Sequence, residues 1–333
     1  MASSKSMTRS AESATKRRLV ITRQLPQPVE ARAQRDYTAL LNAADRPFTH
    51  DDWRSRCTAA EAVLCTPADR LDAEVIVQLP ESIRIIATFS VGYEHIDLAA
   101  AAARNIVVTN TPDVLTDATA DIAMLLLLGA ARRASEGEAL MRQRAWTGWG
   151  PTQLMGTHVG GKALGIVGFG RIGQAVARRA VAFGMRVHCL SRNKRDLPGL
   201  ETQQHANETT FWPSCQFVSL HLPLTSATRH YLNAARIARL PRGAIVVNTA
   251  RGDVVDDDAL IAALSSGHLA AAGLDVYSGE PNFRAEYAAL PNTFLLPHLG
   301  SATLETRSAM GFRALDNLDQ FFAGEPPADR VTR

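Results

Sequence analysis

The chain has 333 residues, of which 46% are hydrophobic and 21% charged, and its formal net charge is +3. This balance is that of a soluble globular protein of one or two domains. So small a charge excludes a summed field that would hold the protein on nucleic acid or on an anionic membrane. The longest apolar run, Ile122 to Ala131, is about half of what spans a bilayer. We therefore expect no nucleic-acid partner and no membrane partner.

The first residues are polar and basic and contain no apolar stretch, so they cannot act as a secretory signal. We expect residues 1–16 to form a disordered tail. None of the four cysteines, Cys57, Cys65, Cys189 and Cys215, belongs to a C-x-x-C pair. In a chain of this size, reduced thiols in a cytoplasmic protein are favoured over a disulfide framework.

Short apolar runs alternate with helical segments in the first third of the chain. Strands are predicted at residues 19–21, 61–66, 83–90 and 105–111, and a helix is predicted over residues 29–44. Such alternation implies parallel pairing through crossover connections, and therefore an α/β domain.

A long helix is predicted from Thr116 to Arg144. Its middle is apolar on nearly every side, which requires burial on several sides. Packing between two domains and packing at a subunit interface both explain this pattern, and the sequence leaves the two open.

Strands and helices alternate most regularly in the second half of the chain. The pattern predicts a doubly wound sheet of six or seven parallel strands and a final helix over residues 303–323. The predicted strands cover residues 163–167, 185–190, 216–222, 244–250 and 271–277, with a helix over residues 171–183.

A glycine-rich segment, Gly168 to Gly173, follows the first of these strands and opens a helix. This context is typical of a dinucleotide-binding turn. Gly168 permits the tight turn, Gly170 lets the backbone approach a pyrophosphate at the helix N-terminus, and Gly173 lets helix and strand pack closely. A purely structural turn is the alternative interpretation.

The residues after the next strand bear on the choice of dinucleotide. They read Ser191, Arg192, Asn193 and Lys194, with no acidic residue before Asp196. An NAD enzyme normally places an acid there for the ribose hydroxyls, whereas a guanidinium suits a 2′-phosphate. The pattern favours NADPH over NADH, and a solvated basic turn is the alternative.

Three ionisable residues follow strands or extended segments of the same predicted sheet. Arg251 can pair with a substrate carboxylate and polarise the adjacent carbonyl. Glu280 next to His298 would stabilise the imidazolium and fix its tautomer, which gives a proton donor near neutral pH. Taken singly, Arg251 could instead pair with Asp253 or Asp256, Glu280 could cap a turn, and His298 could be an ordinary loop histidine.

Five motifs in this order resemble the D-isomer-specific 2-hydroxyacid dehydrogenase family, from about residue 18 to residue 325. They are GFGRIGQ (168–174), HLPLTSATRHYLN (221–233), NTARGDVVDDDAL (248–260), AAGLDVYSGEP (271–281) and PHLGS (297–301). The resemblance implies a Rossmann-type dinucleotide-binding domain, residues 111–298, inserted into a flavodoxin-like substrate domain, residues 17–110 and 299–333. It also implies a homodimer and closure of a cleft that excludes water.

The resemblance further implies residue roles. Arg251 binds the substrate carboxylate, His298 is the acid/base, and Glu280 orients it. The backbone of Val91 and Gly92 also holds the carboxylate. The residues implied to contact the cofactor are Thr116, Gly168, Gly170, Arg171, Ile172, Gly173, Ser191, Arg192, Asn193, Lys194, His221, Leu222, Pro223, Thr228, Thr249, Ala250, Asp275 (through the nicotinamide carboxamide) and Gly300.

Within the family, residues 108–128, the segment from Trp146 to Trp149 and the turn at Ser191 are similar to the glyoxylate/hydroxypyruvate reductases. In that subgroup the residue at Trp149 approaches the partner subunit's active site and helps to select small substrates. Filling of the dimer interface is the equal alternative.

We therefore expect NADPH-preferring reduction of glyoxylate or hydroxypyruvate to the 2-hydroxy acid. A bulkier 2-oxo acid is the alternative substrate. Formate dehydrogenase has glutamine where Glu280 stands, and regulated phosphoglycerate dehydrogenases often carry a further C-terminal domain. A nucleotide-sensing corepressor would retain the same residues, but the small net charge and the lack of long interaction tails disfavour it.

Overall fold

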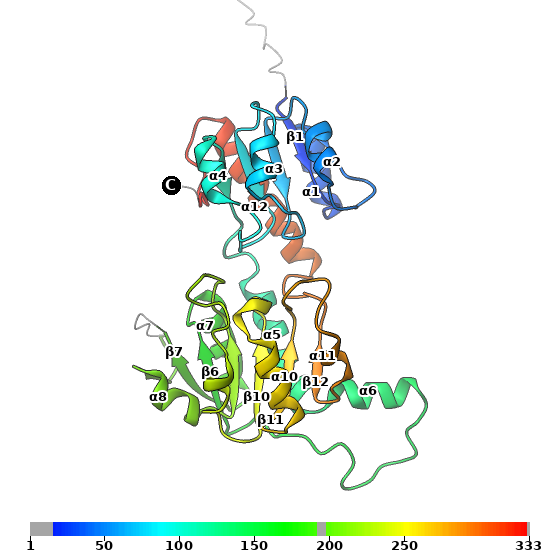
Figure 1. Ribbon diagram of the computed structural model, residues 1–333, viewed down its shortest axis with the longest axis vertical. Coiled ribbons are helices and arrows are strands. Elements are labelled where there is room, and N and C mark those ends of the chain that lie inside the picture. The colour runs from blue at the N-terminus through cyan, green and yellow to red at the C-terminus, as the bar shows by residue number, and fades with distance from the viewer. Residues whose placement is uncertain (1–15, 192–197, 332–333) are drawn as a thin grey trace, which may run out of the picture. The chain divides into compact units, whose positions relative to one another are not determined.

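The computed structural model describes residues 16–191 and 198–331 (Figure 1). The chain divides into two compact units, one of Met1–Pro112 with Ser308–Arg333 and one of Asp113–Arg307. Each unit is built on one parallel sheet with helices on both faces, so the predicted α/β class is confirmed. Apart from Lys16, the predicted tail lies outside the described residues. No helix in the described part of the chain is long and apolar enough to cross a membrane.

The first unit contains a five-stranded sheet in the order β2-β1-β3-β4-β5, and all its strand pairs are parallel. This is the flavodoxin-like order. The strands are β1 (Arg18–Ile21), β2 (Thr38–Leu40), β3 (Ala62–Cys65), β4 (Ile85–Thr88) and β5 (Val107–Thr109). The helices are α1 (Gln27–Asp36), α2 (His50–Arg56), α3 (Ala73–Gln78), α4 (Leu98–Ala103) and, from Ser308 on, α12 (Leu304–Phe322).

The helix predicted over residues 29–44 is wrong beyond Asp36. The chain is extended at Tyr37, and residues 38–40 pair with residues 18–20 as an edge strand. Ladder hydrogen bonds to β1 therefore outweigh the helix propensity of this stretch, a tertiary override of a local preference.

The second unit contains a seven-stranded parallel sheet in the order β12-β11-β10-β9-β6-β7-β8, which is a Rossmann-type arrangement. The strands are β6 (Ala163–Val167), β7 (Arg186–Leu190), β8 (Thr202–His205), β9 (Phe217–Leu220), β10 (Ala244–Asn248), β11 (Leu269–Leu274) and β12 (Thr293–Leu295). The prediction missed β8 because this polar edge strand has no apolar run to mark it.

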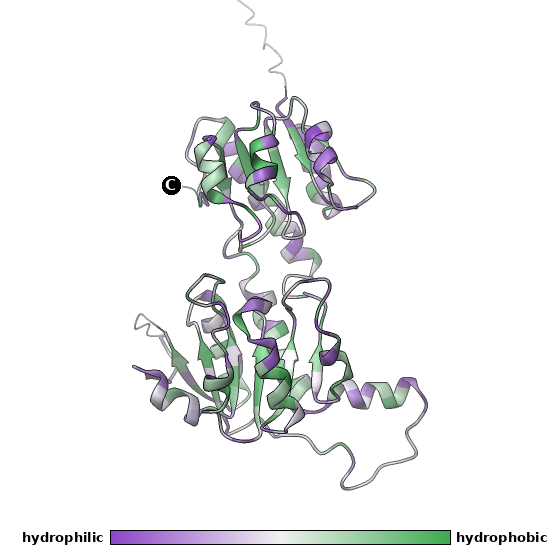
Figure 2. Ribbon diagram, viewed as in Figure 1, coloured by the Kyte–Doolittle hydropathy of each residue, from purple (hydrophilic) through white to green (hydrophobic). Residues whose placement is uncertain are grey.

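Helices cover both faces of this sheet. On one face α5 (Thr116–Ala131) and α7 (Arg171–Ala182) pack against side chains such as Ile245 and Val247. On the other face α10 (Asp257–Ser265) packs with Ala244 and Val246, together with the shorter elements α8 (Glu208–Phe211), η1 (Trp212–Ser214), α9 (Ala234–Ile237) and α11 (Ala285–Ala289). Alternate residues of one strand thus supply two cores, and the strands are correspondingly green in Figure 2.

The single long helix predicted over residues 116–144 is two helices, α5 and α6 (Ala134–Arg142). Arg133 between them has a left-handed backbone with φ 53°. The carbonyl of Ala131 accepts a hydrogen bond from the amide of Thr157 at 2.7 Å, so the returning chain supplies a partner at the end of α5. A Cβ at Gly156 would lie 2.3 Å from that carbonyl oxygen, so only glycine permits this approach.

The boundaries of the two units also differ from the predicted ones. Residues 299–307 belong to the second unit, because the amides of Leu299 and Gly300 donate to the Asp275 carboxylate at 2.6 and 2.8 Å. Residues 111 and 112 belong to the first unit, where the amide of Thr111 donates to the carbonyl of Ser90 at 2.8 Å.

Candidate active site

Three glycines shape the turn between β6 and α7, each in a different way. Gly168 has φ +91°, and a Cβ there would lie 2.5 Å from the carbonyl oxygen of His221. A Cβ at Gly173 would lie 2.3 Å from the carbonyl oxygen of Gly168. A Cβ at Gly170 would meet nothing within 4 Å. Gly168 and Gly173 are therefore required by the fold, whereas Gly170 leaves open space beside the backbone.

The surroundings of this turn suit an anionic dinucleotide. Gly170 is the N-cap of α7 and offers no side-chain acceptor, and the first turn carries no acidic residue. The first amides of the helix are therefore available to phosphate oxygens. Directly after β10, which is separated from β6 by β9 in the sheet, Thr249 Oγ1 is buried and has no hydrogen-bond partner among the described residues. These donors fit a bound pyrophosphate and its attached riboses.

The loop after β9 forms the next part of the predicted cofactor wall. His221 is hydrogen-bonded through Nε2 to the Ser219 hydroxyl at 2.8 Å. Removal of its ring from water lowers the pKa of His221 to about 4, so the ring is neutral at physiological pH. The Thr228 hydroxyl donates to the carbonyl of Pro223 at 2.6 Å, which fixes the turn that follows Leu222.

Part of the predicted nucleotide-selecting turn lies outside the described residues. Ser191 is described, half-buried and directly after β7. Arg192, Asn193 and Lys194 are among the residues that the structure does not describe. Thr116 is the first residue of α5, and Arg171 and Ile172 begin α7.

Arg251 follows β10 in a turn fixed by Asn248. The Asn248 amide group donates to the carbonyl of Arg251 at 2.9 Å and accepts from the amide of Ala250 at 3.0 Å. A Cβ at Gly252 would lie 1.8 Å from the carbonyl carbon of Tyr277. Glycine after the arginine therefore allows the loops that follow β10 and β11 to pack backbone against backbone.

His298 and Glu280 form the direct pair that the sequence predicted, with Nδ1 and Oε2 2.8 Å apart. The other carboxylate oxygen of Glu280 accepts from the amide of Tyr277 at 2.7 Å. Burial raises the pKa of Glu280. The hydrogen bond and charge of His298, the Tyr277 amide and the charge of Arg251 lower this pKa, and together they outweigh the effect of burial. The net pKa is below the ordinary value, so Glu280 is a carboxylate at neutral pH.

Asp275 lies at the end of β11 and is 1% exposed. Its two carboxylate oxygens accept from the amides of Leu299 and Gly300. Burial raises the pKa of Asp275, and the two amides and His298 only partly oppose this effect. The predicted contact with a carboxamide would be additional to these backbone bonds.

The remaining predicted substrate contacts are Val91, Gly92 and Trp149. Val91 and Gly92 belong to the first unit, where the Asn110 side chain donates to the carbonyl of Val91 at 2.7 Å and the Ser90 hydroxyl donates to that of Gly92 at 2.5 Å. Trp149 is 82% exposed in the segment after α6. Among the described residues, no hydrogen bond or ring contact joins Trp149 to the His298–Glu280 pair.

Thr119 and Tyr277 were missed by reasoning from the sequence. The Thr119 hydroxyl donates to the carbonyl of Gly300, and the Tyr277 hydroxyl lies 3.0 Å from the carbonyl of Leu274 and 2.9 Å from that of Leu296. The first two turns of α5 also carry Thr116, Asp117 and Asp121, so no sequence signal singled out Thr119. Nothing in the sequence marked the tyrosine hydroxyl.

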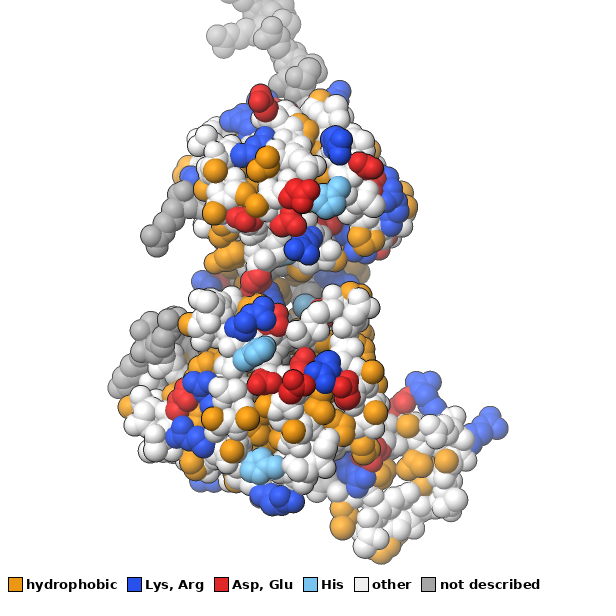
Figure 3. Space-filling model, in the orientation of Figure 1, with side chains coloured by type: hydrophobic (Ala, Val, Ile, Leu, Met, Phe, Trp, Pro, Cys, Tyr) orange, Lys and Arg blue, Asp and Glu red, His pale blue; other side chains and the backbone are white. Residues whose placement is uncertain are grey.

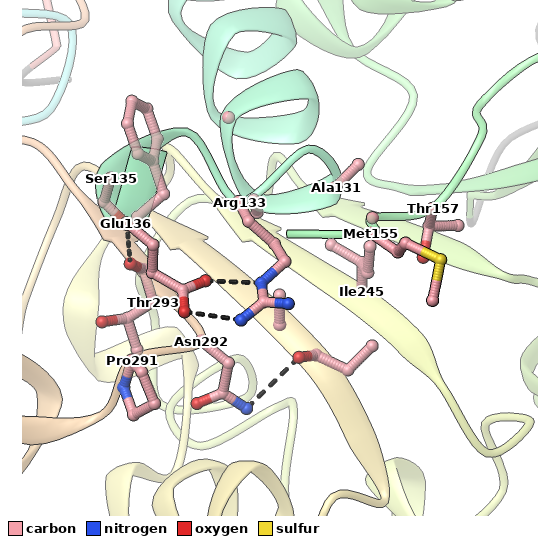
Figure 4. Close-up of a pocket in the computed structure, with 16 residues that line it drawn as sticks. Ala131, Arg133, Ser135, Glu136, Met155, Thr157, Ile245, Pro291, Asn292 and Thr293 are labelled. Carbon is pink, nitrogen blue, oxygen red and sulfur yellow. Dashed lines mark hydrogen bonds and ion pairs between the residues drawn. The ribbon is translucent and has the colours of Figure 1, made fainter. Parts of the chain in front are cut away.

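A cavity of ≈ 310 Å³ lies elsewhere in the second unit, at the start of β10, β11 and β12 (Figure 4). Its polar groups are engaged with each other: Arg133 pairs with Glu136, and the Ser135 hydroxyl donates to the carbonyl of Thr293. In doubly wound sheets ligands bind at the carboxyl ends of the strands. The cavity is at the opposite edge, so the candidate site is the cluster around His298.

A Rossmann-type sheet with a glycine-rich turn and an Arg–Glu–His set beyond its strand ends defines a dinucleotide-dependent oxidoreductase. The family model described as "D-isomer specific 2-hydroxyacid dehydrogenase, NAD binding domain" matches residues 124–300. The chain belongs to this family. It is a 2-hydroxyacid dehydrogenase that uses a nicotinamide dinucleotide.

Individual relatives match nearly the whole chain. It is 45% identical to the glycerate dehydrogenase of Hyphomicrobium methylovorum, over 93% of this chain and 97% of the relative. It is 40% identical to the glyoxylate reductase of Thermococcus litoralis, over 96% and 97%. The structure of an NADPH-dependent glyoxylate/hydroxypyruvate reductase from Sinorhizobium meliloti, in complex with NADP and malonate, matches with a TM-score of 0.83 at 33% identity, over 95% and 97%.

Two alanine substitutions in the glycine-rich turn should separate folding from cofactor binding. Gly173→Ala forces a Cβ against the Gly168 carbonyl and should lower the free energy of unfolding by about 1–3 kcal/mol. Gly170→Ala meets no protein atom, so the loss of stability should not exceed about 1 kcal/mol, the cost of alanine at a helix N-cap. Its Cβ would enter the space of the pyrophosphate, and NADPH should bind at least about tenfold more weakly. Denaturant unfolding and fluorescence titration measure the two effects. Unchanged NADPH binding by Gly170→Ala would contradict a pyrophosphate at this turn.

Proposed function

We propose that the enzyme reduces a small 2-oxo acid, glyoxylate or hydroxypyruvate, and prefers NADPH. The observation that carries this proposal is the His298–Glu280 pair, beyond the strand ends of the sheet whose glycine-rich turn suits a dinucleotide. Two glyoxylate-reducing relatives support the choice of substrate. A third relative is a glycerate dehydrogenase, and glycerate is the 2-hydroxy acid formed when hydroxypyruvate is reduced.

His298 acts as the proton donor. Its Nδ1 donates to Glu280, so Nε2 is the ring nitrogen that can release a proton to the substrate carbonyl oxygen. Arg251 pairs with the substrate carboxylate and polarises the neighbouring carbonyl. The bound reduced nicotinamide supplies the hydride that the carbonyl carbon accepts.

Glu280 keeps the donor ready in two ways. Its negative charge stabilises the imidazolium, and its position is itself fixed by the Tyr277 amide. The His298 and Glu280 side chains are 44% and 33% exposed, so solvent screens part of this interaction.

The preference for NADPH rests on the turn after β7. Ser191 at the end of that strand offers a hydroxyl where NAD enzymes normally place an acid, and the cations of residues 192, 194 and 195 follow in the sequence. The reductase from Sinorhizobium meliloti is NADPH-dependent, which supports the same preference here.

Initial rates of cofactor oxidation test the proposal directly. NADPH should give at least about tenfold higher kcat/KM than NADH, a transition-state preference of about 1.4 kcal/mol. Glyoxylate and hydroxypyruvate should react faster than a phenyl-substituted 2-oxo acid. Ser191→Asp should reverse the cofactor preference by repelling the 2′-phosphate, whereas Ser191→Ala should retain it. A wild-type preference for NADH would contradict the interpretation of this turn, and absence of turnover would contradict the substrate class.

The pH dependence of reduction tests the Glu280–His298 pair. Because its pKa is lowered, Glu280 stays ionised within the usual titration range of a glutamate. Only acidification through the lowered pKa removes the negative charge beside His298. Glu280→Gln is neutral at every pH and cannot supply the carboxylate that holds His298 Nδ1, so kcat should be at least about tenfold lower than in the wild type at neutral pH. The variant should also lack the fall in rate that protonation of Glu280 causes in the wild type on acidification. Glu286→Gln, at an exposed carboxylate paired with Arg284, is the matched control and should leave the profile unchanged. Identical profiles for wild type and Glu280→Gln would disprove the pairing role.

We also propose that the enzyme is a homodimer formed through the second unit. Leu125 of α5 is 46% exposed, and Phe183 at the end of α7, a helix packed against α5, is 47% exposed. Trp146 and Trp149 are exposed on the segment after α6, which projects from the second unit and carries orange side chains in Figure 3. Large exposed apolar side chains on packed helices and on a projecting segment are what an association surface requires.

Sedimentation velocity tests the dimer. Leu125→Glu places a charge on the proposed interface and should convert the dimer into monomer at micromolar concentration. Val77→Glu makes the same change at an exposed aliphatic residue of α3 in the first unit and should leave the dimer intact. A monomeric wild-type protein, or a dimer that withstands Leu125→Glu, would refute this assignment.

A further inference from the structure

The loop that carries His298 has a backbone conformation that needs support. His298 itself has φ 55°, in the left-handed region that residues with a Cβ rarely adopt. Its side chain is nearly half exposed, so packing around the ring contributes little to holding it. Besides the hydrogen bond between the ring and Glu280, the conformation is therefore fixed through the backbone of residues 298–300.

Asp275 holds one side of this loop. Its own carbonyl accepts the amide of His298 at 2.9 Å. Its carboxylate accepts the next two amides, those of Leu299 and Gly300. Three consecutive amides thus donate to one buried residue, which fixes the direction of the chain as it leaves His298.

Thr119 holds the other side. Its hydroxyl donates to the carbonyl of Gly300 at 3.1 Å, and the side chain is 5% exposed. A Cβ at Gly300 would lie 3.3 Å from Asp275 Oδ2 and 3.4 Å from Thr119 Oγ1. The peptide at Gly300 is therefore enclosed between these two side chains, with its amide bonded to one and its carbonyl to the other.

The position of Thr119 is set by the close approach of α5 to the sheet. A Cβ at Gly273 in β11 would lie 2.7 Å from the carbonyl oxygen of Leu126, and a Cβ at Gly129 would lie 2.5 Å from the ring of Phe294 in β12. These glycines let the helix backbone lie directly on the two strands that lead to Asp275 and His298. Thr119, at the end of the first turn of α5, reaches the loop after β12, where its hydroxyl bonds to the Gly300 carbonyl.

We propose that Thr119 is a positioning residue for His298, and that it acts through the Gly300 carbonyl together with Asp275. The inference rests on the proposed function, because it assigns Thr119 to the proton donor of that reaction. Without the hydroxyl, the buried carbonyl of Gly300 loses its donor and the loop is held only through its amides. The His298 ring would then spend less time in the orientation that delivers its proton.

Thr119→Val keeps the branched shape and removes the hydroxyl, while Thr119→Ser keeps the hydroxyl. We expect kcat for glyoxylate reduction to fall about fivefold in Thr119→Val, the equivalent of one neutral hydrogen bond. Thr119→Ser should recover at least half of the wild-type kcat. Ser135→Ala is the matched control: it removes a hydroxyl that donates to the Thr293 carbonyl near the start of β12, and it should leave kcat within about twofold.

Hydrogen–deuterium exchange gives a readout that does not depend on turnover. In Thr119→Val, a peptide covering residues 296–303 should exchange faster than in the wild type, and in Ser135→Ala it should not. The combined Thr119→Val/Asp275→Asn variant should lose less kcat than the product of the two single losses, because both act on the same loop.

The results separate the two proposals. Wild-type kcat in Thr119→Val with unchanged exchange would overturn the positioning role while leaving the proposed reaction intact. A loss that Thr119→Ser does not restore would also overturn it, because the hydroxyl would not be the group responsible. Absence of turnover in the wild type would refute the proposed function, and the exchange experiment would still decide whether Thr119 holds the loop.

Discussion

The parallel pairing of β6, β9, β10 and β11 is the constraint on which the candidate site depends. Because these strands run in one direction, their carboxyl ends lie at a single edge of the sheet. Gly168, Arg251 and Asp275 follow β6, β10 and β11, and so reach the same edge although they are far apart in the chain. The direction of the strands therefore brings the residues of the site to one edge of the sheet, independently of the contacts between their side chains.

Close backbone contacts then refine the arrangement. Gly252 allows the loop after β10 to touch the loop that leads to Glu280, and Gly273 allows α5 to lie on β11. At these two points the missing side chain of glycine is what allows the backbones to approach. Hydrogen bonds then fix the side chains. The Tyr277 amide donates to Glu280, the His298 ring bonds to Glu280, and the Asp275 carboxylate accepts from the backbone that follows His298. Each group is thus fixed by a neighbour whose position the sheet already determines.

Much of this could be predicted from the sequence, because it depends on local patterns. The buried strands around Ile166 and Val246 appear as apolar runs, and the glycine-rich turn is recognisable from its spacing between a strand and a helix. Three predictions failed where local preference and tertiary structure disagree. Residues 38–40 pair as a strand despite a helical pattern, the polar edge strand β8 carries no apolar signal, and the chain returning at Thr157 bonds to the end of α5 where a longer helix was expected.

The sequence by itself determined the α/β class, the dinucleotide turn and the identity of the ionisable residues, because strand periodicity, glycine spacing and residue chemistry are all local properties. The pairing of His298 with Glu280 was expected from the resemblance, and the structure adds its 2.8 Å distance. Only the tertiary structure decided how the loop after His298 is held, with Gly300 enclosed between Asp275 and Thr119. Thr119 is 181 residues from Gly300 in the chain, and a linear pattern carries no information about a contact that the packing of a helix on a sheet creates.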